Sequence, residues 1–145
     1  MIRRRWWKVA GLLAAMMLVL GACSSDNYND ARELFSDQAQ VAEDYVSGLE
    51  KADNADDVAD VIDKYTDDLV DLAPRMKAFH EKHPDMAGLF GNSAVPDELK
   101  KESERFKTAM AKVQGAAMNL MKYMNEPQVR AAFERMGNEM RNLRE

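Results

Sequence analysis

Between residues 55 and 79, apolar side chains recur at alternating steps of three and four residues, and this pattern constrains the fold more than any other feature of the sequence. The stripe consists of Ala55, Val58, Ile62, Tyr65, Leu69, Leu72, Met76 and Phe79. Such steps place all eight side chains on one face of an α-helix, which other apolar groups must then cover. Pro74 lies inside the stripe without changing its phase. We therefore expect a kinked helix, capped by Asp53 or Asn54 and running to about residue 83.

Three further stretches show the same helical period. Residues 27–52 carry a stripe at Tyr28, Ala31, Phe35, Gln38, Ala42, Tyr45, Leu49 and Ala52. A third helix is expected from Pro96, with its stripe at Leu99, Ser103, Phe106, Met110, Val113, Ala117, Leu120 and Met124. A short fourth carries Val129, Phe133, Met136, Met140 and Leu143, and Asn125 with Gln128 before it is typical of a helix cap. We predict an all-α fold, an antiparallel bundle of about four amphipathic helices with a kinked second and a short fourth helix. A homodimer through coiled-coil packing of the longer helices is the alternative.

The first 22 residues have the pattern of an export signal. Basic residues at positions 3, 4, 5 and 8 precede an apolar run over residues 9–20, which is too short for the roughly 20 residues that a membrane span needs. The run ends in Leu20-Gly21-Ala22-Cys23, which resembles the lipobox of bacterial lipoproteins. The resemblance implies cleavage before Cys23 and attachment of diacylglycerol to its thiol. The chain then divides into a signal peptide (1–22), a lipidated Cys23 with a short tether (23–27) and a helical bundle domain (28–145).

The lipoprotein resemblance also implies a location. Ser24 follows the lipidated cysteine, and in this family an Asp at that place resembles an inner-membrane retention signal. We therefore expect the periplasmic face of the outer membrane, or the exterior of the plasma membrane if the host is Gram-positive. Only residues 24–27 separate Cys23 from the first predicted helix, a reach of roughly 15 Å. The sequence thus favours an envelope protein partner at the membrane surface.

Charge and motif content exclude several functions. Residues 24–71 hold 15 acidic and 3 basic side chains, whereas residues 72–145 hold 10 acidic and 13 basic ones. A domain this acidic lacks the basic footprint that nucleic acid requires. Cys23 is the single cysteine, His80 and His83 are the only imidazoles, and the few glycines are scattered, so no haem motif, catalytic triad or phosphate loop is predicted. We expect a protein that is not an enzyme and carries no cofactor besides its covalent lipid.

Two groups of side chains are candidates for a soft metal. Met118, Met121 and Met124 recur every three residues, and His80 and His83 lie one helical turn apart. Thioethers favour Cu(I), an ion that proteins of the cell envelope encounter. Methionine also fills helical cores and lines permissive hydrophobic grooves, and Met124 lies on a predicted core stripe. The sequence therefore predicts a non-enzymatic binding, accessory or structural lipoprotein of the envelope, with a small-ligand or Cu(I)-binding protein as the alternative.

Overall fold

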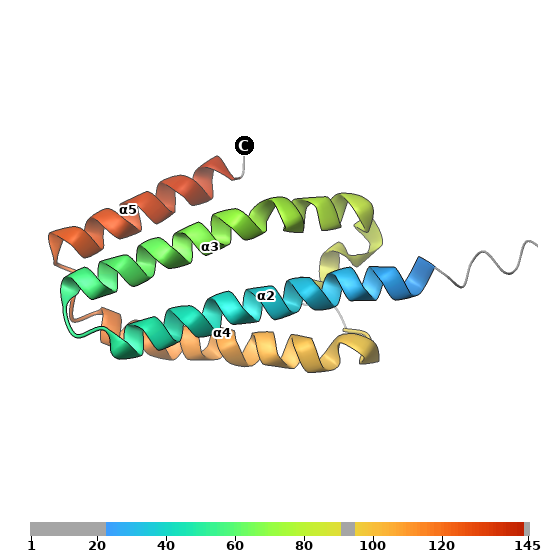
Figure 1. The fold of residues 1–145 in the computed structure, drawn as a ribbon, viewed down its shortest axis with the longest axis horizontal. Helices are drawn as coiled ribbons and strands as arrows, with labels where there is room; N and C mark the ends of the chain where they lie inside the picture. The colour runs from blue at the N-terminus through green and yellow to red at the C-terminus, as the bar shows by residue number, and fades with distance from the viewer. Residues whose placement is uncertain (1–22, 91–94, 144–145) are drawn as a thin grey trace, which may run out of the picture.

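The computed structural model describes residues 23–90 and 95–143, and over these residues it contains four long α-helices and two short 3-10 helices (Figure 1). The long helices are α2 (Cys23–Lys51), α3 (Ala55–Lys82), α4 (Lys100–Leu120) and α5 (Pro127–Asn142). Between α3 and α4 lie η1 (Pro84–Phe90) and η2 (Asp97–Leu99). The described residues form no strand, and the predicted all-α bundle is confirmed. The predicted signal peptide, residues 1–22, lies outside the described residues.

The start of α3 agrees with the sequence prediction. Asn54 caps the helix, because its side-chain oxygen accepts a hydrogen bond of 3.0 Å from the backbone N–H of Asp57. The helix then continues through Pro74 and ends at Lys82, one residue before the predicted end. At the other end of the hairpin α2 begins at Cys23, so residues 23–27, for which we expected a tether, belong to the helix.

The predicted cap of the last helix is wrong. Glu126 takes the capping position of α5 without a side-chain hydrogen bond, and Pro127 occupies the first helical turn. Proline suits that position because its missing N–H would have no intrahelical partner there. The amide of Gln128 instead donates to Asp56 of α3, at 3.0 Å. The side chain of Gln128 thus forms a tertiary contact with α3 in place of the predicted local cap.

Successive helices run in opposite directions, but two pairs that pack side by side are parallel (Figure 1). α2 packs along both α3 and α4, and α5 packs along α3. Gln128 and Arg135 of α5 bond to Asp56 and Asp63 of α3, so both helices advance in the same direction. The lateral order is therefore α4, α2, α3, α5, with α4 and α5 at the two edges.

The buried core is concentrated at the two ends of the bundle. All four helices meet in one cluster beside the α2–α3 and α4–α5 turns, formed by Val46, Leu49, Val58, Ala59, Ile62, Ala116, Leu120, Val129 and Ala132. A second cluster joins α2 and α3 to η1 and η2, formed by Ala31, Leu34, Phe35, Leu72, Phe79, Leu89 and Leu99. Between them, Ala39 and Ala42 of α2 pack on Ala109 of α4.

Several positions of the predicted stripes are not fully buried. Ala117 and Met124 were predicted to face the core, but both are exposed. Ala116 takes the place of Ala117, because the packed face of α4 is rotated by one residue near its end, and Met124 lies in the turn after α4. Half-buried apolar side chains also remain in the middle of the bundle, at Tyr65, Leu69, Met76, Phe106, Met110, Met136 and Met140. Five of these seven side chains, all except Met110 and Met136, line a single groove.

Candidate functional site

An apolar groove of about 300 Å³ lies between the edge helices α4 and α5, with α2 and α3 as its floor. Its lining comprises Gln38 and Val41 of α2, Tyr65, Leu69, Leu72, Ala73 and Met76 of α3, Phe106 of α4, Met140 of α5, and Leu143 directly after α5. Apart from the Gln38 amide and the Tyr65 hydroxyl the lining side chains are apolar, and none is charged. We refer to this site as the α4–α5 groove.

The groove exists because α5 is short and because α4 and α5 share buried contacts only at one end of the bundle. Both helices contribute to the core cluster beside the turn that joins them, through Leu120 and Val129 among others. Towards the other end α5 stops at Asn142, whereas α3 continues to Lys82, as Figure 1 shows. The groove is thus closed at the turn and has no α5 wall at the end where α2 begins.

The floor of the groove is held by contacts between α2 and α3. The rings of Tyr45 and Tyr65 stack with their centroids 4.4 Å apart, and burial raises the pKa of both hydroxyls. The Gln38 amide donates to the sulfur of Met76 at 3.5 Å. The Gln38 amide and the Tyr65 ring therefore both contact side chains of the neighbouring helix, which keeps the floor in place.

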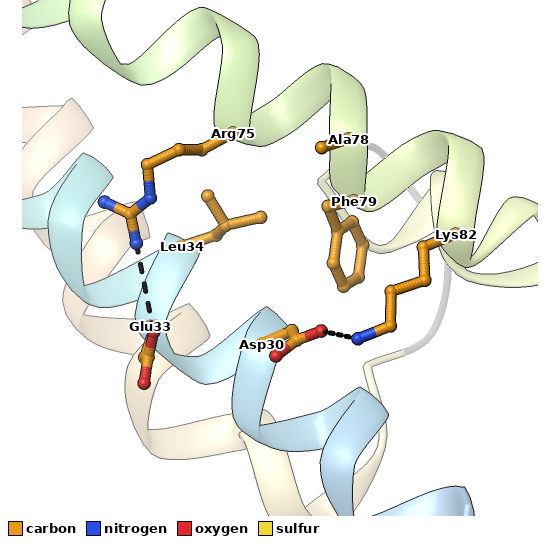
Figure 2. A pocket seen from close by; sticks show the side chains of 7 residues that line it. All are labelled: Asp30, Glu33, Leu34, Arg75, Ala78, Phe79 and Lys82. Atoms are coloured by element: carbon orange, nitrogen blue, oxygen red, sulfur yellow. Dashed lines mark hydrogen bonds and ion pairs between the residues drawn. The ribbon is translucent and has the colours of Figure 1, made fainter.

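A second cavity, of about 230 Å³, lies between the start of α2 and the end of α3 (Figure 2). Its charged side chains bind each other. Lys82 Nζ lies 2.7 Å from Asp30 Oδ2, and Arg75 Nη2 lies 3.9 Å from Glu33 Oε2. The remaining lining residues are Leu34, Ala78 and Phe79. Because its charges are paired across the two helices, this cavity stabilises the α2–α3 hairpin and offers less to a ligand than the groove.

The candidate metal ligands lie at opposite ends of the bundle. Met118, Met121 and Met124 lie at the end of α4 and in the turn after it, and they are 76%, 72% and 43% exposed. The neighbouring Tyr123 hydroxyl donates to the carbonyl of Asp53, which places this turn beside the start of α3. His80 and His83 lie at the other end of α3, whose 28 residues span about 40 Å. The predicted set of five ligands therefore cannot form one site.

His83 has a structural role at the end of α3. Its side chain is 4% exposed, its ring contacts Phe79, and its Nε2 lies 3.3 Å from Asp30 Oδ2. Hydrogen bonds from Lys82 and from His83 lower the pKa of the Asp30 carboxyl. Among the described residues, no group of three or more His, Cys, Asp or Glu side chains has an arrangement that could hold a metal ion.

Sequence reasoning did not identify the α4–α5 groove as a site. Leu69, Met76 and Phe106 were predicted to be core residues. The available signal for a site was Gln38, the one polar member of the stripe over residues 27–52. Comparisons with protein families, with curated proteins and with solved structures found no match for this chain. In the part of the chain that the structure describes, no helix combines the length and apolarity needed to cross a bilayer.

Proposed function

We propose that this protein is a lipid-anchored lipoprotein of the periplasmic face of the outer membrane that acts by binding an apolar ligand in the α4–α5 groove. The groove is the observation that supports this proposal most directly. Small-molecule sites are concave, mostly apolar pockets of about 300–1,000 Å³ with a few placed polar groups. At about 300 Å³, with Gln38 and Tyr65 as its polar groups, the groove matches the lower end of that range.

The composition of the groove favours binding over catalysis. Its lining offers one amide and one hydroxyl but no carboxylate, imidazole or amine that would act as a base. General acid–base and nucleophilic chemistry both need a suitable group beside the reacting atom, and burial raises the pKa of the Tyr65 hydroxyl, which makes it a poor base. We therefore propose a non-enzymatic binding or accessory role in the envelope. An envelope protein partner and a homodimer remain predictions.

Binding in the groove is tested with the full-length Cys23→Ser protein, which carries no lipid, and the uncharged fluorophore N-phenyl-1-naphthylamine. We expect saturable binding that Leu69→Gln weakens at least tenfold, because it places an amide in the middle of the apolar lining. Met118→Gln is the matched control, since it makes a similar change at an exposed position outside the groove, and it should bind like the parent. Ala73→Phe fills the groove with an apolar ring and should also weaken binding. Absence of saturable binding by the parent protein would contradict the proposal.

The anchor is tested separately by metabolic labelling with palmitate. Cys23→Ser should abolish labelling because it removes the only thiol that can accept lipid, whereas Ser24→Ala should be labelled like the wild type. Two or more acyl chains, at about 0.8 kcal/mol per buried methylene, would hold a small domain durably at the membrane. Equal labelling of Cys23→Ser and wild type would end the lipoprotein assignment.

Cu(I) binding is a second candidate, favoured by the exposure of Met118, Met121 and Met124 at one end of the bundle. It would use the three thioethers without either histidine. Titration with Cu(I) in competition with a chromophoric chelator tests this, with Met118→Leu/Met121→Leu as the variant and Met136→Leu as the control. Equal Cu(I) affinity in the two variants would exclude this site.

A further inference from the structure

The dimensions of the α4–α5 groove restrict what it can hold. Its lining residues on α3 run from Tyr65 to Met76, which is about 17 Å along the helix. A volume of about 300 Å³ at that length describes a long and narrow groove. A single hydrocarbon chain is narrow as well, because carbon atoms in contact lie about 3.5–4.0 Å apart. An α-helix with its side chains is about 10 Å wide and does not fit. The groove is thus wide enough for one extended aliphatic chain.

The length of the groove sets the length of that chain. A carbon–carbon bond is about 1.5 Å long, and an extended chain advances roughly 1.25 Å for each bond because of its zigzag. About 17 Å therefore corresponds to roughly 13 bonds, or a chain of about 12 to 14 carbons. Shorter chains would leave part of the lining uncovered, and longer ones would extend into water.

Positive side chains adjoin the end of the groove that α5 leaves open. Lys77 directly follows Met76, one turn after Ala73, and Lys107 directly follows Phe106. Both lysines are exposed, and neither forms a salt bridge with another described residue. The nearest acid further along α3 is Glu81, a full turn beyond Lys77. The open end therefore offers two cations to the head group of an amphiphile.

Four acidic side chains in the middle of α2 and α3 lie on a different face. Asp37, Asp44, Asp68 and Asp71 line a separate cavity together with Lys64 and Arg75. Val41 and Leu72 line both that cavity and the groove, so they separate the acidic face from the apolar one. A head group at the open end of the groove is thus kept apart from these four acids, which favours a negative head group over a positive one.

The acyl chains of the protein's own anchor are not available to the groove. Under the function proposed above, the chains on Cys23 are buried in the membrane. A chain that holds the domain at the membrane does not also occupy the groove, so the occupant is a separate molecule.

Building on the function proposed above, we infer that the α4–α5 groove binds the single aliphatic chain, of about 12 to 14 carbons, of a free fatty acid, with its carboxylate between Lys77 and Lys107. The apolar lining takes the chain, and the open end leaves the carboxylate in water beside the two ammonium groups. Attraction across such a solvent-exposed gap is salt-dependent. The chain thus supplies most of the affinity, and the lysines select the sign of the head group.

The inference is tested by displacement of N-phenyl-1-naphthylamine from the full-length Cys23→Ser protein. Saturated fatty acids of 8 to 18 carbons are compared below their micelle-forming concentrations, and myristate is compared with tetradecanol and tetradecyltrimethylammonium. We expect the tightest binding at 12 to 14 carbons, and myristate at least tenfold tighter than the ammonium compound. Lys77→Glu/Lys107→Glu should weaken myristate binding at least tenfold and leave tetradecanol unchanged. Lys101→Glu/Lys112→Glu, with the same charge change elsewhere on α4, is the control.

The outcomes separate the two proposals. If neither the fluorophore nor any of the amphiphiles binds, the proposed function itself fails. If acid, alcohol and ammonium compound bind equally, the groove remains a binding site but the carboxylate assignment is overturned. An affinity that keeps rising to 18 carbons would overturn the single-chain fit. Tighter binding of a lysophospholipid than of myristate would show that the ligand is a membrane lipid and not a free fatty acid.

Discussion

Replacing Gly48 with alanine should destabilise the bundle, although the same substitution stabilises most helices. Gly48 lies at a close contact between α2 and α3, and an added Cβ would lie 2.8 Å from Cγ2 and 2.9 Å from Cγ1 of Val61. A valine side chain in a helix has one strongly preferred rotamer, so Val61 cannot turn away and the helices must shift. Overpacking of this kind costs about 1–3 kcal/mol. The gain in helix propensity offsets about 1 kcal/mol, which leaves a net loss of up to about 2 kcal/mol.

Two other glycines are matched controls. A Cβ at Gly115 of α4 or at Gly137 of α5 meets no atom within 4 Å, so alanine there should stabilise the protein by about 0.5–1 kcal/mol. Urea unfolding followed by circular dichroism at 222 nm measures all three variants. Val61→Ala in the Gly48→Ala background should restore part of the loss, and the double-mutant cycle gives the coupling between the two positions. Equal stabilisation by Gly48→Ala and Gly115→Ala would refute the close approach of α2 and α3.

The same unfolding assay should distinguish core residues from groove residues. Ile62→Ala should cost about 2–5 kcal/mol because Ile62 is fully buried. Leu69→Ala should cost less than about 1.5 kcal/mol because Leu69 is half buried and faces the groove. Similar losses would place Leu69 in the core. A hydrogen bond from Arg105 lowers the pKa of Glu43, so this pair contributes stability above the ordinary pKa of a glutamate and loses it as the pH falls through the lowered value. Arg105→Gln should therefore raise the pKa of Glu43 in an NMR titration. Because both side chains are partly exposed, the variant should cost only about 0.2–1 kcal/mol at pH 7, and the part due to the Glu43 carboxylate should disappear as the pH falls through its lowered pKa.

The helices were predictable because their signals are local. The stripe from Ala55 to Phe79 predicts α3 through Pro74, and Asn54 has both the position and the side chain of a cap. The step of five residues between the stripe positions Met124 and Val129 predicts a break between the last two helices, and α4 and α5 are indeed separate. Where a prediction failed, a tertiary contact had replaced a local one, as for Gln128, whose amide binds Asp56 of the neighbouring helix.

The groove was not predictable because it depends on which faces of the helices pack against each other. Periodicity places Leu69, Met76 and Phe106 on apolar faces, but it does not determine which faces meet. The sequence also gives no measure of where α5 ends relative to α3, which decides how much of the floor stays open. The distance between the two groups of metal candidates was unpredictable for the same reason, since the stripes do not show that His80 and Met121 lie at opposite ends of the bundle.

The parallel pairing of α2 with α4 and of α3 with α5 determines the order in which the chain can fold. α2 and α3 are joined by residues 52–54 alone, so they close as a hairpin at little entropic cost. The bonds of Arg105 to Glu43 and of Arg135 to Asp63 instead join residues 62 and 72 positions apart. Loop closure becomes slower and costlier as that separation grows. We therefore expect the hairpin to form first and α4 and α5 to join it from opposite sides. The groove, where α4 and α5 face each other, should then be the last part of the bundle to form and the first to open.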